Sequence, residues 1–239
     1  MDATLRRLAP LSGVIFVVLY VIGSIIGMSD SPDFAGSSQE ITEYYTDSKD
    51  EILVATVIAA IATPFYIWFL GCLRSAIARV EGGTTRLAST AFGAGIAAGA
   101  AGVAGVMVNA MGALRIDEQD TIAGPTATAY YDIGQILAFA ATPALLAAGL
   151  VATAVASLRY RAILPAWLAY VTIVLAIIDV IPPISWLGTL LGLVWVLVVS
   201  GIFYTQHVAD EVGIVGPKAP APAAAPPPPT PPPGGGPAV

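Results

Sequence analysis

The sequence predicts an all-α integral membrane protein, in which a bundle of six transmembrane helices is followed by a disordered C-terminal tail rich in proline and alanine. Hydrophobic residues make up 56% of the 239 residues, charged residues only 11%, and the mean hydropathy is +0.80. A soluble globular domain carries about twice that share of charged residues. Six apolar runs approach the roughly 20 residues that a helix needs to cross a bilayer.

The predicted spans cover residues 11–28, 52–72, 90–114, 133–158, 164–181 and 184–204. Buried helices of soluble proteins keep a polar stripe, which the runs VTIVLAIIDVI and LLGLVWVLVVSGIF lack. The first run follows two arginines, as a signal peptide would, but the next residues, GMSDSPDF, lack the small-x-small cleavage pattern. We therefore expect an uncleaved first helix and a membrane domain over residues 1–212.

The positions of lysine and arginine predict the orientation in the membrane. Eight of the ten lie before the first span, between spans two and three, between spans four and five, or after span six. The remaining two, Lys49 and Arg115, lie in the alternate loops, on the side that also holds twelve of the sixteen acidic residues when Asp179 at the end of span five is included. Because cations are retained on the cytoplasmic side, we expect both termini to be cytoplasmic.

The tail, residues 213–239, contains eleven of the nineteen prolines and no aromatic residue. Such a segment buries too little apolar surface to fold, so we expect it to be disordered. Its proline run favours extended polyproline II structure. Two roles stay open for it, a low-complexity tether and a docking site for a partner that binds proline-rich ligands.

The loop before the second span contains a predicted short helix. The pattern Ser-x-x-Glu occurs at Ser37–Glu40 and again at Ser48–Glu51, and each is typical of a capping box at a helix N-terminus. The helix between them carries Ile41, Tyr44 and Tyr45 on one side. Because tyrosine is enriched at membrane–water interfaces, we expect this helix to lie there.

The third span has the composition of a tightly packed helix. Small residues allow helix backbones to approach closely within a bilayer, which predicts packing contacts at Gly95, Gly99 and Gly102. The sequence leaves open whether the neighbour belongs to the same chain or to a second copy. Glycine recurs in this span at residues 93, 95, 99, 102, 105 and 112.

Two spans carry the tripeptide Ala-Thr-Pro, which places prolines at Pro64 and Pro143. Proline within a helix removes a hydrogen bond and kinks the axis. Paired interruptions of this kind are typical of transporter binding sites at the membrane midplane. The distance to the next arginine, however, is 10 residues in one span and 16 in the other, so chance recurrence in an alanine-rich chain is the competing interpretation.

Signatures of enzymes are missing from the sequence. The chain has one histidine, His207, and one cysteine, Cys72, so histidine or thiolate metal sites and a Ser-His triad have no residues to form them. It contains neither Gly-x-Ser-x-Gly nor a phosphate-binding glycine loop. We expect no catalytic residue, no metal, no cofactor and no nucleic-acid partner.

A set of polar residues near the predicted outer side is the candidate functional site. Intramembrane ionisable residues are functional candidates because they are costly to leave unpaired. The competing interpretation is hydrogen bonding between helices. We also expect an ion pair in this set, between Asp179 and Arg115, which would tie the outer ends of spans five and three. The set comprises Asn109, Arg115, Asp132, Gln135 and Asp179.

Four segments of the chain have a recognisable order and spacing: EITEYYTDSKDEIL before span two, WFLGCLRSAIARVEGG after it, ILPAWLAY opening span five and WVLVVSGIF in span six. Through them, residues 5–205 resemble an uncharacterised group of small six-span membrane proteins from high-GC actinobacteria. The resemblance implies a bacterial plasma membrane and supplies no activity.

Two functions are compatible with these observations. The first is a non-catalytic scaffold or regulatory subunit that contacts the lipid bilayer and either another membrane protein or a second copy of itself. The second is a small transporter or channel whose outward-facing vestibule is formed by the five polar residues.

Overall fold

The computed structural model describes residues 9–28, 31–33, 36–161, 163–181 and 184–212, and it confirms the all-α class for them, with no β-strand in these ranges. The predicted disordered tail, residues 213–239, lies outside the described residues. A π-helical segment, η2, joins two of the α-helices. In chain order the elements are η1 (Ala9–Leu11), α2 (Ser12–Met28), α3 (Ser38–Asp47), α4 (Lys49–Glu81), α5 (Arg86–Gln119), α6 (Gly124–Ile136), η2 (Leu137–Ala141), α7 (Thr142–Tyr160), α8 (Ala166–Val180) and α9 (Ser185–Val212).

Among the described residues, five helices rather than the predicted six are long and apolar enough to cross a membrane. The predicted span 164–181 forms only the 15-residue α8. Its length of about 22 Å is shorter than the roughly 30 Å hydrocarbon core. The prediction counted apolar residues beyond both ends of the helix, whereas Pro165 is its N-cap and two prolines follow Ile181. The five are Ala9–Met28, Lys49–Glu81, Arg86–Gln119, Gly124–Tyr160 and Ser185–Gln206.

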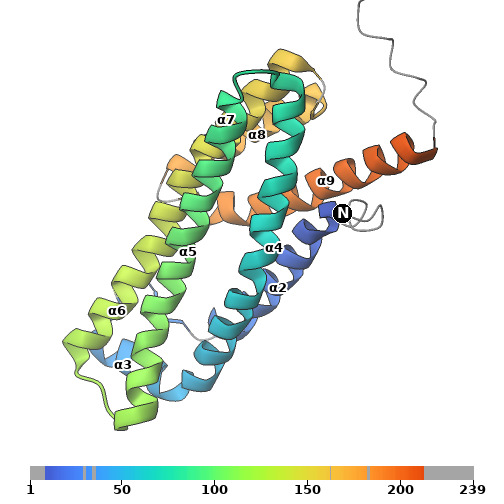
Figure 1. Ribbon diagram of the computed structural model, residues 1–239. Coiled ribbons are helices and arrows are strands. Elements are labelled where there is room, and N and C mark those ends of the chain that lie inside the picture. Colours follow the sequence, from blue (N-terminus) through green and yellow to red (C-terminus); the bar gives the residue numbers. More distant parts are fainter. Residues whose placement is uncertain (1–8, 29–30, 34–35, 162, 182–183, 213–239) are drawn as a thin grey trace, which may run out of the picture.

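Helix α5 lies in the middle of the bundle, with α4, α6 and α7 packed against it (Figure 1). Helix α2 packs along α4, and α8 packs along α7, so neighbours in space are mostly neighbours in sequence. Helices α3 and α9 are exceptions. Helix α3 packs on α6 and α5, and α9 runs obliquely across the others and contacts α8, η2, η1 and α2 (Figure 1).

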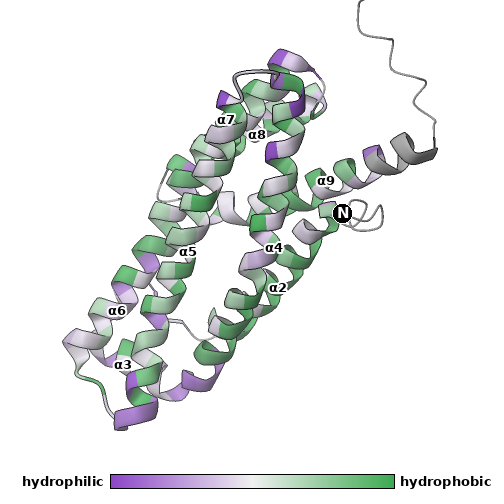
Figure 2. Ribbon diagram, in the orientation of Figure 1, coloured by the Kyte–Doolittle hydropathy of each residue, from purple (hydrophilic) through white to green (hydrophobic). Residues whose placement is uncertain are grey.

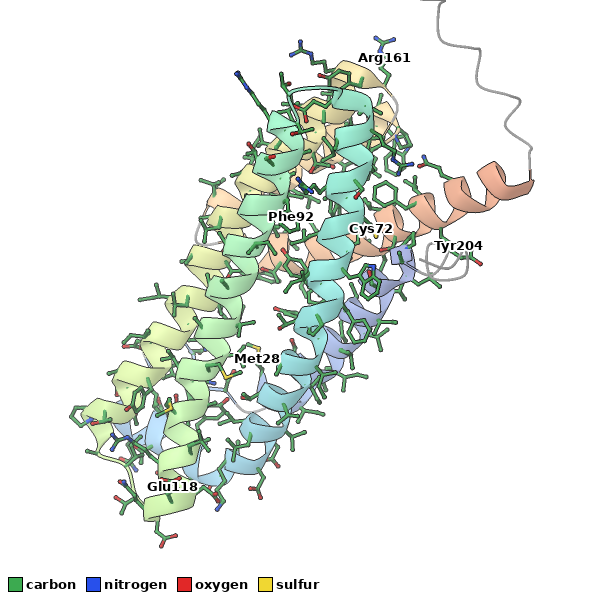
Figure 3. All side chains as sticks on the ribbon, in the orientation of Figure 1. Met28, Cys72, Phe92, Glu118, Arg161 and Tyr204 are labelled. Carbon is green, nitrogen blue, oxygen red and sulfur yellow. The ribbon has the colours of Figure 1, made fainter. Side chains whose placement is uncertain are left out.

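The two ends of the bundle are polar and the middle is hydrophobic (Figure 2). We call the end that contains α3 and the C-terminus of α5 the acidic end, and the end that contains the α4–α5 connection the basic end. Glu118 and Arg161 mark these opposite ends (Figure 3). This separation is expected for helices of 33 and 34 residues, which at about 50 Å exceed the hydrocarbon core of a bilayer.

The α4–α5 seam is closed in the half of the bundle nearer the basic end. A methyl group at Gly95 would lie 2.7 Å from a methyl of Leu70, and one at Gly99 would lie 2.8 Å from the ring of Tyr66. Tyr66 also donates a hydrogen bond of 3.1 Å to the Gly95 carbonyl. Gly102 faces α7 instead. The three glycines therefore lie at contacts between α5 and two different neighbours within the chain.

The predicted capping box at Ser37 is confirmed, and the one at Ser48 is wrong. The Glu40 N–H donates to Ser37 Oγ at 3.2 Å, and the Ser37 N–H donates to Glu40 Oε2 at 2.8 Å. The side chain of Ser48 makes no capping hydrogen bond to Glu51 or any other N–H of α4. Ser48 already ends α3, where its N–H donates to the Tyr44 carbonyl, and its φ and ψ of −109° and 21° are not those of an extended N-cap.

The apolar side of α3 packs on the rest of the protein. Ile41 and Tyr45 are fully buried, and Tyr44 is nearly so. They form a second hydrophobic cluster with residues of α5 and α6, including Ala113 and Tyr131. The apolar periodicity of the sequence identifies this buried side without identifying what buries it.

Glu81 caps α5 from the preceding helix. Its carboxylate accepts hydrogen bonds from the N–H groups of Leu87 at 2.7 Å and Ala88 at 3.0 Å. Both N–H groups belong to the first turn of α5, where a negative charge also interacts favourably with the helix dipole. The acid thereby fixes the α4–α5 connection, a role that sequence spacing did not reveal.

The prolines of the two Ala-Thr-Pro repeats lie in different local structures. Pro64 lies within the continuous helix α4, whereas Pro143 is the second residue of α7, which follows the π segment η2. Pro143 has no N–H to give to the carbonyl of Phe139, four residues earlier. Ser185 at the start of α9 donates to that carbonyl at 2.7 Å. The structure thus gives a long-range role to the second proline, which differs from that of the first.

Candidate functional site

The structure brings two of the five predicted polar residues into one cavity. Asn109 of α5 and Gln135 of α6 line a cavity of about 140 Å³ between α2, α4, α5 and the α6–η2 segment. Arg115, Asp132 and Asp179 are not among its lining residues. The predicted set of five is therefore divided among separate places.

Small residues line much of the cavity. They include Gly23 of α2, Ala55 and Ala59 of α4, Gly105 of α5 and Gly134 of α6. Gly105 and Gly134 also bring the backbones of α5 and α6 into close contact beside the cavity. Figure 3 shows Met28, another lining residue, at the acidic-end side of the space between α2 and α5.

The Asn109 side chain is hydrogen-bonded to a tyrosine of the short helix α3. The Tyr45 hydroxyl donates to Asn109 Oδ1 at 2.7 Å, and Tyr45 itself is fully buried. Burial first, then the nearby Tyr44, Tyr131 and Asp132, raise the pKa of Tyr45 well above its ordinary value. The hydroxyl therefore keeps its proton at any physiological pH, and the orientation of the Asn109 amide stays fixed.

Two tyrosines link the helices near the acidic-end side of the cavity. Tyr44, which lines the cavity, packs on Tyr131 with ring centroids 5.9 Å apart, edge to face. The Tyr44 hydroxyl donates to the carbonyl of Gly27 at 2.9 Å, and the Tyr131 hydroxyl donates to the carbonyl of Pro32. These bonds join α3 and α6 to the segment around the end of α2. The sequence showed the tyrosines but not these contacts.

Arg115 and Asp132 lie away from the cavity lining. Arg115 is exposed, donates from Nε to the Tyr130 hydroxyl at 3.3 Å, and lies over the Tyr130 ring. Asp132 is half-buried on α6. Among the described residues the ion pair present is Lys49 with Asp117, at 3.2 Å and largely exposed.

The predicted pair between Asp179 and Arg115 is wrong. Asp179 is 3% exposed, and its Oδ1 has no hydrogen-bond partner among the described residues. Its carboxylate lies against Gly188 of α9, one turn after Ser185, which bonds to Phe139 halfway along the α6–α7 helix. Arg115 contacts Tyr130, which lies nearer the acidic end of the same α6–α7 helix. The helix rise between Tyr130 and Phe139 therefore separates Asp179 from the level of Arg115 by roughly 15 Å.

We expect Asp179→Asn to raise the free energy of unfolding at pH 8 by about 1–2 kcal/mol, because it removes a buried charge that lacks a partner. The two side chains have the same shape, so the contact with Gly188 is kept. Equilibrium unfolding of the purified protein in mixed micelles measures the effect. Glu118→Gln, at an exposed position, is the control and should change little.

The same experiment tests the pair directly. With no pair, the effects of Asp179→Asn and Arg115→Gln should add within about 0.5 kcal/mol. Lower stability of Asp179→Asn, together with a double variant that loses less than the sum, would show that the two side chains interact.

Comparison with protein-family models, curated proteins and solved structures finds no significant match to this chain.

Proposed function

We propose that the protein crosses a bacterial plasma membrane with both termini in the cytoplasm and acts without catalysis, as a scaffold or regulatory subunit. The membrane location is supported by five long apolar helices. The orientation is supported by the cations near the basic end, and the bacterial membrane by the sequence resemblance.

The observation that carries the non-transporting role is that the residues lining the cavity stop halfway along α4 and α5. Its lining residues reach Ala59 on α4 and Gly105 on α5. Beyond them, towards the basic end, Tyr66 and Leu70 fill the α4–α5 seam against glycines. The polar side chains that line the cavity therefore extend from the acidic end only to the middle of the bundle. Such an arrangement suits a binding site rather than a transport path.

The apolar faces of α8 and α9 are the candidate contact surfaces for a membrane partner or a second copy. Trp167 and Tyr170 on α8 are 60% and 61% exposed, and Trp186 on α9 is 55% exposed. Lipid would cover these faces in a protein that acts alone. Photo-crosslinking from Val174, which is exposed on α8, distinguishes the two cases in native membranes. A discrete crosslinked protein or dimer is expected, and adducts to lipid alone would contradict a scaffold.

A small transporter remains the second candidate, because Asn109 and Gln135 do line a common cavity. Transport would require the seam at Tyr66 and Leu70 to open. Reconstituted vesicles should show no flux of protons or small solutes above empty vesicles if the scaffold proposal holds.

The orientation gives a prediction of its own. In a Cys72→Ser background, cysteines at Ser38 and Thr126 should react with an impermeant thiol reagent added to intact cells, and one at Gly83 should not. Ser38 and Gly83 are both exposed, so accessibility within the fold does not bias this comparison. Labelling at Gly83 with none at Ser38 would reverse the orientation.

A further inference from the structure

We propose that the cavity binds a small neutral molecule with an apolar body of about six to eight non-hydrogen atoms and one hydrogen-bond acceptor, which the Asn109 amide recognises. This ligand site goes beyond the scaffold role and does not depend on it.

The size of the ligand follows from the size of the cavity. Its volume is about 140 Å³. In another protein, an engineered apolar cavity of about 150 Å³ holds one benzene molecule. A six-membered ring with one substituent therefore approaches the upper limit, and a two-ring compound exceeds it.

The neutrality of the ligand follows from the lining. The nineteen described lining residues include no Asp, Glu, Lys, Arg or His. A charged ligand would lose its hydration with no opposite charge beside it, which is strongly unfavourable. Most of the wall is apolar, with Leu19, Ile52, Val106 and Phe139 among its larger members. The wall therefore favours a hydrocarbon body.

Two hydroxyl groups of the wall already donate to backbone carbonyls. Tyr44 donates to the carbonyl of Gly27 at 2.9 Å, and Thr56 donates to that of Ile52 at 2.7 Å. These two side chains contribute shape to the cavity, while their donors are used within the protein.

Asn109 differs from these groups because one half of its amide is unused. Its Oδ1 accepts the hydrogen bond from Tyr45. Its Nδ2, which carries two donors, has no hydrogen bond to any residue that the structure describes. A carbonyl or ether oxygen is the complementary group, since an amide N–H donates. The Tyr45 bond fixes the amide, so the donors are oriented before a ligand arrives.

The test uses cyclohexanone as the probe. Methylcyclohexane is a control of the same size that lacks a hydrogen-bond acceptor, and cyclohexanecarboxylate is the charged analogue. Binding is measured calorimetrically on the full-length protein in nanodiscs, after subtraction of empty nanodiscs. Cyclohexanone should bind roughly three- to tenfold more tightly than methylcyclohexane, the range that one hydrogen bond supplies. The carboxylate should show no saturable binding.

Two variants of α4 locate the binding. Ala59→Leu places a larger side chain in the cavity and should abolish saturable binding of both neutral probes. Ala60→Leu makes the same change at the adjacent exposed position and should leave binding unchanged. Equal binding to the two variants would overturn the proposal, because the probes would then occupy lipid or another surface.

Asn109→Leu tests recognition. It keeps a side chain of similar size and removes the donors, so cyclohexanone should fall to the affinity of methylcyclohexane. If this variant does not fold, the wild-type preference for cyclohexanone over methylcyclohexane still decides the matter. Equal wild-type affinities, or an acyl chain in the cavity that cyclohexanone does not displace, would refute the proposed ligand class.

Discussion

Replacing Tyr45 by alanine is expected to lower the free energy of unfolding by about 3–5 kcal/mol, the range for truncation of a buried aromatic side chain. Tyr45 is fully buried, packs on Tyr44 with ring centroids 5.5 Å apart, and lies directly against Gly112 of α5. Its loss opens a cavity under α3 and removes the hydrogen bond to Asn109. Equilibrium unfolding in mixed micelles gives the loss.

Two further substitutions separate the causes of that loss. Tyr45→Phe keeps the ring and removes only the hydroxyl, so it should cost about 1 kcal/mol. Tyr170→Ala removes a ring that is 61% exposed on α8 and should cost much less than Tyr45→Ala. A similar loss at Tyr45 and Tyr170 would mean that α3 does not pack on the bundle as described.

The second large effect is expected for Gly105→Ala, at about 2–3 kcal/mol. A methyl group there would lie 2.8 Å from the carbonyl oxygen of Gly134 and 3.1 Å from the backbone nitrogen of Ala138. Backbone atoms cannot turn aside as a flexible side chain can, so α5 and α6 would have to separate. Thermal unfolding and the same micelle titration report the change.

Gly93→Ala is the matched control, because it lies on the same helix with nothing within 4 Å of the added methyl group. It should be neutral or slightly stabilising, since alanine has the higher helix propensity. Equal losses for the two variants would show that α5 and α6 are not in backbone contact at Gly105.

The helical fold could be predicted from sequence because composition and the lengths of apolar runs carry that information directly. The length of α8 could not be read in the same way. Hydropathy treats the residues around Pro165 and after Val180 as part of one apolar run, whereas the helix needs N–H donors that proline lacks. Placing Asp179 near the outer surface depended on that overestimated length.

The candidate site could be predicted only in part, for a related reason. The sequence identifies Asn109 and Gln135 as polar residues in apolar runs, and the structure places both on one cavity. The cavity itself is lined by residues of α2, α4, α5 and the α6–η2 segment. Which residues of these elements face one another depends on how the helices are aligned along their axes, and the sequence does not give that alignment. The role of Glu81 was missed because its partners, Leu87 and Ala88, lie across a turn.

The bond from Ser185 to Phe139 has a consequence for biosynthesis. The two residues are 46 positions apart, and the ribosome adds about 5–20 residues per second, so Ser185 is made roughly 2–9 s after Phe139. Pro143 has no N–H to donate to the Phe139 carbonyl. During that interval this carbonyl also lacks the hydrogen bond from the Ser185 hydroxyl. Exposed carbonyls are unfavourable in hydrocarbon. The middle of the α6–α7 helix therefore gains this hydrogen bond only after the start of α9 has been synthesised.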